Sequence, residues 1–192
     1  MDNGNGRLAI IACEILKPEL EKLTEGWDDV VHKDYLEFAL HIDAEKLKAT
    51  VQDKVNALEG RVDAVFLGYA ICQSLSGITN HLKVPTVMLE GDDCIAAILG
   101  PVEYARQKSL CGGTWFNTPG WALRGIDGAV KELHLDALVD QDYEPKYFLD
   151  MLFGVPFAAT VFVRLQTQLI QVPLYAVFTK LLARRLSFLV PG

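Results

Sequence analysis

Three cysteines and a histidine lie at or just after the ends of four successive apolar segments. In chain order, the segments and residues are 7–13 with Cys13, 35–42 with His41, 63–70 with Cys72, and 86–90 with Cys94. If the segments are parallel β-strands, their carboxyl ends meet at the edge of the sheet where such folds bind ligands. Zinc prefers thiolate and imidazole ligands at about 2.0–2.3 Å, and thiolates also hold iron–sulfur clusters. The spacing therefore predicts one metal site, with zinc as the first candidate and an iron–sulfur cluster as the second.

Two other interpretations of these four residues stay open. The sequence contains no CxxC pair and no HExxH motif, and cysteine often simply fills space in a protein core. Alternatively, Cys72 or Cys94 could act with His41 as a nucleophile that needs no metal. Cys111 follows a helical segment rather than a strand, so we expect it to be a bystander.

The segment GYAICQSLSG, residues 68–77, has the composition of a ligand-binding loop. Gly68 would allow a tight turn at the end of a strand, and the hydroxyl of Ser74 would lie near a helix start, where anions bind. The segment lacks the Walker lysine and the GxGxxG pattern, so an ordinary strand-to-helix loop is the alternative. Gly68 and Ser74 are thus candidate cofactor-binding residues.

Carboxylates and aromatic rings accompany the proposed ligands. Glu14 follows Cys13 directly and could serve as a general base or orient a ligand, or it could be a solvated surface group. Asp92 or Asp93 can cap the helix that begins near Cys94. The segment Cys111–Trp121 is expected to be an ordered loop whose aromatic residues, Trp121 among them, close over a cofactor or pack beneath the loop.

The elements that must position these residues alternate between strand and helix. After residues 35–42, the stretch from Ala44 to Gly60 carries one apolar stripe, namely Leu47, Val51, Val55 and Leu58. Strands that alternate with helices form right-handed crossovers and a parallel sheet. We therefore expect an α/β fold: an open, mostly parallel, Rossmann-like sheet of five or six strands with helices on both faces. The whole chain, residues 1–192, is expected to form one domain.

Composition limits the classes of function. The 192 residues carry a formal net charge of −7, which makes nucleic acid a poor partner because it demands clustered lysine and arginine. The polar N-terminus lacks the pattern of a signal peptide, so a cytoplasmic protein is expected. Its cysteines are then expected to be free thiols or metal ligands. The apolar stretch Met151–Thr179 is interrupted by Pro156 and Pro173. Its longest uninterrupted apolar piece, about 13 residues, is too short to span a bilayer, which takes about 18 apolar residues. Buried core is expected there, and a partner or homo-oligomer surface is the alternative.

Five segments in order resemble the signature blocks of a prokaryotic family catalogued as domain of unknown function 1638. They are IACEIL, LHIDAEKL, VFLGYAICQSLSGI, EGDDCIAAILG and TWFNTPGW, and the resemblance covers about residues 7–150. Carried onto this sequence, the family pattern marks Cys13, His41, Gly68, Tyr69, Cys72, Asp93, Cys94, Thr118, Gly120 and Trp121. Tyr69, Thr118 and Trp121 are thereby further candidates for cofactor binding. Where the family has glycines, this chain has Ala70 and Gln73.

The resemblance also implies a metabolic setting. The family occurs mainly in anaerobes, and its genes lie near corrinoid-dependent methyltransferases, which implies one-carbon metabolism and a corrinoid as a further candidate cofactor. A corrinoid protein or a methyltransferase is then the expected partner. The alternative within this setting is a non-catalytic accessory or carrier protein that docks through its apolar C-terminal part, residues 151–192, expected to be strand, helix and strand.

Overall fold

The structure is a computed structural model. It describes residues 6–70, 75–89, 93–110, 113–137, 144, 145, 147, 149 and 158–162. Cys72, Ser74, Asp92, Cys111 and nearly all of the apolar stretch 151–192 lie outside the described residues, so the predictions made for them stay predictions. None of the helices formed by the described residues has the length and apolar character needed to cross a membrane.

The first half of the chain forms a four-stranded parallel sheet. Its strands are β1 (Leu8–Cys13), β2 (Val30–Leu36), β3 (Ala64–Ala70) and β4 (Thr86–Leu89), in the order β2-β1-β3-β4. Every residue of the central strand β1 is buried, and so is nearly all of its neighbour β3. Strands that are covered on both faces have to be apolar on both sides, which explains their continuous hydrophobic sequences.

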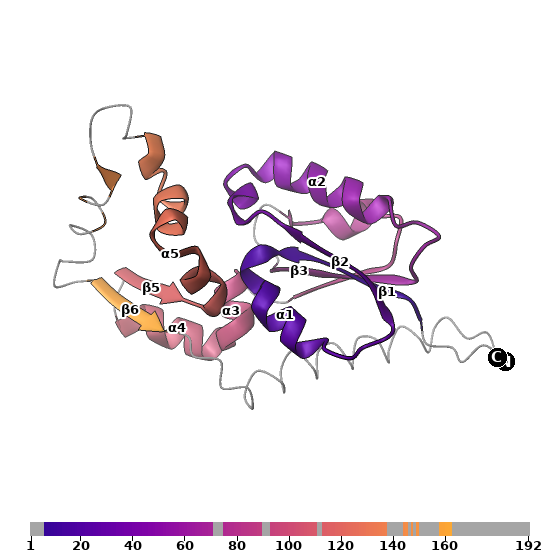
Figure 1. Ribbon diagram of the computed structural model, residues 1–192, viewed down its shortest axis with the longest axis horizontal. Helices are drawn as coiled ribbons and strands as arrows, with labels where there is room; N and C mark the ends of the chain where they lie inside the picture. The colour runs from indigo at the N-terminus through magenta and orange to yellow at the C-terminus, as the bar shows by residue number, and fades with distance from the viewer. Residues whose placement is uncertain are drawn as a thin grey trace.

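Helices cover both faces of this sheet, as the sequence predicts. On one face α2 (Ala44–Asn56) packs Leu47, Val51 and Val55 into a core shared with Ala9 and Ile11 of β1. On the other face, residues of β1 and β3 pack with α1 (Lys17–Leu23) and α3 (Cys94–Leu99). Figure 1 shows α2 and α1 on opposite sides of the strands. The expected fold class, an open parallel α/β sheet, is confirmed.

A second unit lies to the left of the main sheet in Figure 1. It contains α4 (Pro101–Leu110), β5 (Gly113–Asn117), α5 (Pro119–Glu132) and β6 (Ala158–Phe162), and β5 pairs with β6 in parallel. The prediction that Cys111–Trp121 forms a loop is therefore wrong, because this segment contains β5 and the start of α5. The prediction that the segment of β6 adds a fifth strand to the main sheet is wrong as well, because β6 pairs with β5 and not with β4. The second error has a physical cause: strand pairing is a long-range choice that local composition does not report.

The second strand is shifted relative to the sequence prediction. Residues 35–42 were expected to be a strand, but β2 ends at Leu36 and Phe38–Ile42 form a 3-10 helix, η2. The backbone N–H of Phe38 donates a hydrogen bond to the Glu14 carboxylate (3.0 Å) instead of to a neighbouring strand. This contact turns the chain off the sheet edge, so His41 lies in a helical turn after the strand and not at its end.

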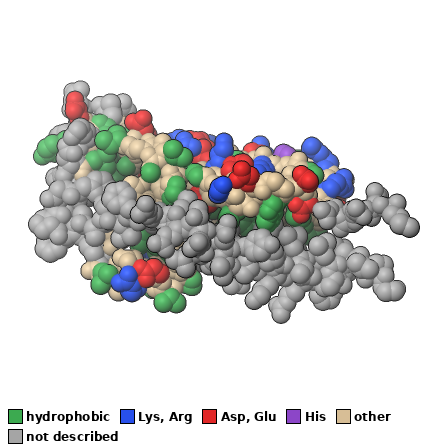
Figure 2. Space-filling model, turned by 60° about the horizontal axis from the view of Figure 1, so that its bottom comes forward, with side chains coloured by type: hydrophobic (Ala, Val, Ile, Leu, Met, Phe, Trp, Pro, Cys, Tyr) green, Lys and Arg blue, Asp and Glu red, His purple; other side chains and the backbone are tan. Residues whose placement is uncertain are grey.

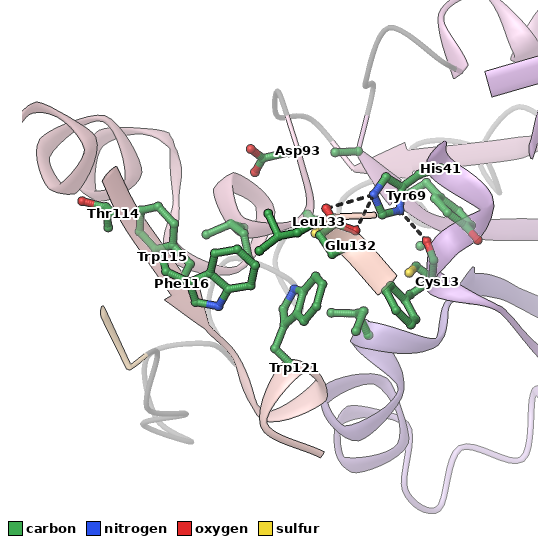
Figure 3. A pocket seen from close by; sticks show the side chains of 16 residues that line it. Cys13, His41, Tyr69, Asp93, Thr114, Trp115, Phe116, Trp121, Glu132 and Leu133 are labelled. Carbon is green, nitrogen blue, oxygen red and sulfur yellow. Dashed lines mark hydrogen bonds and ion pairs between the residues drawn. The ribbon is translucent and has the colours of Figure 1, made fainter. Parts of the chain in front are cut away.

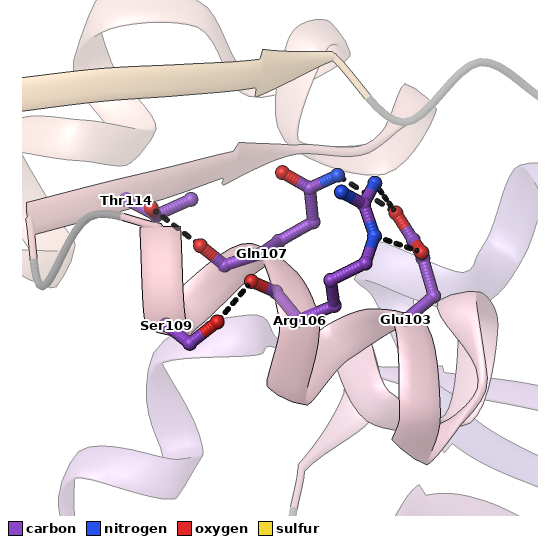
Figure 4. A network of polar contacts seen from close by, with 5 residues as sticks. All are labelled: Glu103, Arg106, Gln107, Ser109 and Thr114. Atoms are coloured by element: carbon purple, nitrogen blue, oxygen red, sulfur yellow. Dashed lines mark hydrogen bonds and ion pairs between the residues drawn. The ribbon is translucent and has the colours of Figure 1, made fainter.

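Polar contacts on α4 connect this helix to β5 (Figure 4). The hydroxyl of Thr114 in β5 donates to the backbone carbonyl of Gln107 (3.4 Å). On the exposed side of α4, Arg106 and the amide of Gln107 lower the pKa of Glu103 to about 2. An exposed pair of this kind adds little stability. The Thr114 contact holds β5 against α4. This position matters because the next two residues of β5, Trp115 and Phe116, line the cavity described below.

On the face shown in Figure 2, charged side chains of both signs are interspersed among the described residues. Around the main sheet, Lys33 pairs with Glu21 (2.9 Å), and Lys54 pairs with Asp34 (2.8 Å). Exposed pairs of this kind contribute little to stability.

Candidate functional site

A cavity of about 480 Å³ lies between the carboxyl ends of β1 and β3 and the second unit (Figure 3). Its described lining includes Cys13 from β1, Gly68 and Tyr69 from β3, His41 from η2, and Cys94 at the start of α3. The second unit contributes Thr114, Trp115, Phe116, Trp121, Glu132 and Leu133. The sequence prediction that Cys13, His41 and Cys94 gather at one edge of the sheet is thus consistent with the lining of a single cavity.

Both nitrogens of the His41 imidazole have partners. Nδ1 makes a short contact with the backbone carbonyl oxygen of Phe38, and Nε2 lies 3.2 Å and 3.0 Å from the two carboxylate oxygens of Glu132. Since a carbonyl and a carboxylate both accept, the fully satisfied ring is the doubly protonated imidazolium. The Glu132 carboxylate accordingly raises the pKa of His41, and partial burial opposes that effect.

The His41–Glu132 pair predicts a pH-dependent stability. A raised folded-state pKa means that the pair stabilises the fold fully below the ordinary histidine value of 6.5 and that this contribution is lost as pH rises through the raised value. We expect Glu132→Gln to return the pKa of His41 toward 6.5. Because the His41 side chain is 40% exposed, the variant should lose no more than about 1 kcal/mol, and only at low pH.

Two measurements check this expectation. An NMR titration of the His41 ring in wild type and Glu132→Gln reports the pKa, and urea unfolding below about pH 6 and above about pH 9 reports the stability difference. Glu59→Gln is the matched control, because Glu59 pairs with Lys83 (3.0 Å) on the surface. A His41 pKa that does not respond to Glu132→Gln would contradict the assignment.

The two described thiols are poor nucleophiles as they stand. Cys13 is 7% exposed, and burial raises its pKa to about 11. Burial also raises the pKa of Cys94, and the neighbouring Cys13 and Asp93 add to the effect. Each thiol therefore stays protonated at neutral pH. A thiolate would add negative charge to an apolar cavity that already holds carboxylates, which is unfavourable.

The described residues do not by themselves complete a metal site. Within this part of the chain, no three histidine, cysteine, aspartate or glutamate side chains are placed to hold one ion together. Cys72, the fourth predicted ligand, lies outside the described residues. The four-residue site therefore stays a prediction, of which the structure describes three members lining one cavity.

Glu14 has a structural contact that its position in the sequence does not reveal. Its carboxylate accepts the backbone N–H of Phe38 and pairs with Arg124 of α5. It is not among the described residues that line the cavity. Glu14 therefore connects η1 (Glu14–Leu16), η2 and α5, and through them it sets the position of His41.

Asp93 and Thr118 both cap helices. Asp93 accepts from the backbone N–H of Ala96 (2.8 Å) at the start of α3, as one of the two predicted caps, and its other oxygen accepts from the Tyr104 hydroxyl. Thr118 is fully buried and caps α5 by accepting from the backbone N–H of Trp121 (3.3 Å). Asp93 and Trp121 line the cavity, whereas Thr118 acts from behind it as the residue that fixes the start of α5.

Gly68 lines the cavity for a reason other than the predicted turn. It lies inside β3, directly opposite Ala12 of β1. A Cβ at this position would meet the Ala12 side chain and lie 3.3 Å from Leu20. Glycine is therefore required by the close approach of two strands and of α1, not by a turn at the strand end.

Sequence reasoning missed Glu132 and placed the aromatic residues of β5 in a loop. Glu132 is the last residue of α5 and is separated from His41 by 91 positions, so no local pattern connects the two. Trp115 was assigned to a loop, although the β-branched and aromatic residues at positions 114–116 are typical of a strand and could have indicated one.

Comparison with known proteins identifies a family. A family model described as protein of unknown function (DUF1638) matches residues 35–155. The match includes His41, Cys72, Cys94 and the whole of β5 and α5, and it agrees with the resemblance seen in the sequence blocks. Searches of curated proteins and of solved structures returned no match.

Proposed function

For a chain that belongs to the family of proteins of unknown function DUF1638, we propose binding of a soft divalent metal ion, zinc in the first place, by thiol and imidazole groups at the carboxyl edge of the main sheet. One observation carries the proposal: Cys13, Cys94 and His41, from three separate elements, line the same cavity. Two sulfurs and one imidazole are a donor set that zinc takes in catalytic sites. The three described side chains are not placed to hold one ion as they stand, so metal binding requires them to move together.

The electrostatics of the cavity favour a bound cation. Burial raises the pKa of the Cys13 and Cys94 thiols and keeps them protonated, and the neighbouring Cys13 adds to the effect at Cys94. A divalent ion reverses this preference, since it replaces the missing positive charge and stabilises thiolates. Metal binding would then release the protons of both thiols and the Nε2 proton of the His41 imidazolium.

The histidine is held as metal-binding histidines usually are. The contact of Nδ1 with the Phe38 carbonyl fixes the ring so that Nε2 is directed at Glu132 in the cavity. A backbone carbonyl on the non-ligating nitrogen is a common way to orient an imidazole ligand. Binding requires Glu132 to move off Nε2 or to become a ligand itself, and Cys72 is the predicted additional thiolate.

A metal-free cysteine nucleophile is less favoured by the same geometry. Such a mechanism needs the imidazole to take the thiol proton. The described contacts of the His41 ring are with Phe38 and Glu132, and the pKa of the Cys94 thiol is raised rather than lowered. The link to corrinoid cofactors and methyltransferases stays a prediction.

Elemental analysis of protein purified without oxygen tests the proposal. We expect close to one zinc per chain in the wild type and a loss of most of it in Cys13→Ser, Cys94→Ser and Cys72→Ser, since each substitution removes a thiolate. Replacing zinc by cobalt should produce thiolate-to-cobalt charge-transfer absorption, which reports sulfur ligation directly.

Cys111→Ser is the matched control and should keep the full metal content. Circular dichroism and thermal unfolding of each variant separate loss of a ligand from loss of the fold. Wild-type protein without stoichiometric metal, even after incubation with zinc, would overturn the proposal. Iron with acid-labile sulfide in place of zinc would overturn the choice of metal.

A further inference from the structure

The cavity is larger than a metal site requires. Its volume of about 480 Å³ falls within the range of pockets that hold organic ligands, about 300–1,000 Å³. A water molecule occupies about 30 Å³ of liquid, so an ion with its bound water would leave most of the space unused. The cavity therefore has room for an organic ligand, and its lining limits the chemistry of that ligand.

The charges around the cavity disfavour anions. Its described lining includes the carboxylates of Asp93 and Glu132 but neither lysine nor arginine, and its one cation, the His41 imidazolium, is paired with Glu132. The two basic residues of α5 nearby are already paired, Arg124 with Glu14 and Lys131 with Glu37. Asp93 accepts from two neutral donors, the Ala96 N–H and the Tyr104 hydroxyl, and neither of these contacts cancels its charge. Phosphates and carboxylates would meet repulsion here.

Aromatic rings form the walls opposite these carboxylates. Trp121 packs edge to face with Trp115, at 5.7 Å between centroids and 69° between planes, and with Phe38 at 5.4 Å and 69°. Figure 3 shows Trp121 in the centre of the cavity wall, with Trp115 and Phe116 on the side away from His41. Neighbouring rings at steep angles enclose a ligand from more than one direction, and tryptophan gives the strongest attraction between a cation and a π face.

We infer that the cavity binds a small organic cation, a quaternary ammonium group, against Trp115 and Trp121, with Asp93 supplying the negative charge. A quaternary ammonium group has no N–H to donate, so it needs an apolar, electron-rich surface and a nearby carboxylate rather than hydrogen-bond acceptors. The inference goes beyond the proposed metal site and rests on the lining of the cavity alone.

Calorimetric titration with choline and with dimethylbutanol tests the inference. Dimethylbutanol has the shape of choline, with a tert-butyl group in place of the trimethylammonium group. We expect saturable choline binding that is about tenfold tighter than that of dimethylbutanol, a ratio that corresponds to about 1.4 kcal/mol. Trp121→Leu should abolish the preference, and Trp121→Phe, which keeps a π face, should retain part of it.

The variant Asp93→Asn removes the negative charge and keeps the start of α3 in place, because asparagine also caps helices. It should weaken choline and leave dimethylbutanol unchanged. Trp27→Leu, outside the described cavity lining, is the control for a general loss of tryptophan. Equal binding of the two compounds, or no saturable choline binding, would overturn the inference. Running both titrations on zinc-loaded and metal-stripped protein separates this outcome from failure of the metal proposal.

Discussion

Replacing Gly120 by alanine is expected to displace the start of α5 and to disrupt the cavity. Gly120 is buried at the first turn of α5, where it packs against η1. An added Cβ would lie 2.6 Å from the carbonyl carbon of Ile15 and closer still to its oxygen. These are backbone atoms, which cannot rotate away as a side chain can, so one of the two elements has to move.

The expected cost of Gly120→Ala is the upper part of the range for overpacking, about 1–3 kcal/mol in urea unfolding. Because Trp121 is the next residue and Glu132 ends the same helix, a shift of α5 should also weaken choline binding and lower the pKa of His41. Ala122→Ser, in the same turn of α5 but exposed, should change none of these. A variant with unchanged stability and unchanged choline affinity would show that α5 can shift without affecting the site.

Ile11→Ala is expected to produce the other large loss. Ile11 lies in β1 between β2 and β3, has no exposed surface, and belongs to the core shared with α2. Removing a buried isoleucine side chain costs about 2–5 kcal/mol, because the transfer free energy is lost and a cavity remains. Since Cys13 is two residues further along the same strand, a loosened β1 should also lower the metal content.

Urea unfolding of Ile11→Ala and Val102→Ala measures this difference. Val102 is 83% exposed on α4, so its truncation should change the free energy of unfolding by no more than about 0.5 kcal/mol. Similar losses in the two variants would contradict the assignment of β1 to the centre of the core.

The main sheet could be predicted because its signals are local. Continuous apolar segments predict β1 and β3, and the stripe of Leu47, Val51 and Val55 predicts α2, since side-chain burial repeats with the period of the element. Parallel strands then place Cys13 at the same edge as the residues that follow β3 and β4, and that geometry led to the candidate site. Local capping chemistry predicted Asp92 or Asp93 as a helix cap, and Asp93 is the cap of α3.

The tertiary structure alone decided which partners those residues have. Glu14 ends β2 by bonding Phe38, β5 pairs with β6 instead of extending the main sheet, and Glu132 reaches His41 across 91 positions. The sequence determined which segments are buried, because burial repeats within a single helix or strand. It did not determine contacts between distant segments, because these depend on how closely two elements pack, as at Gly120 against Ile15, and that distance is set by the whole core.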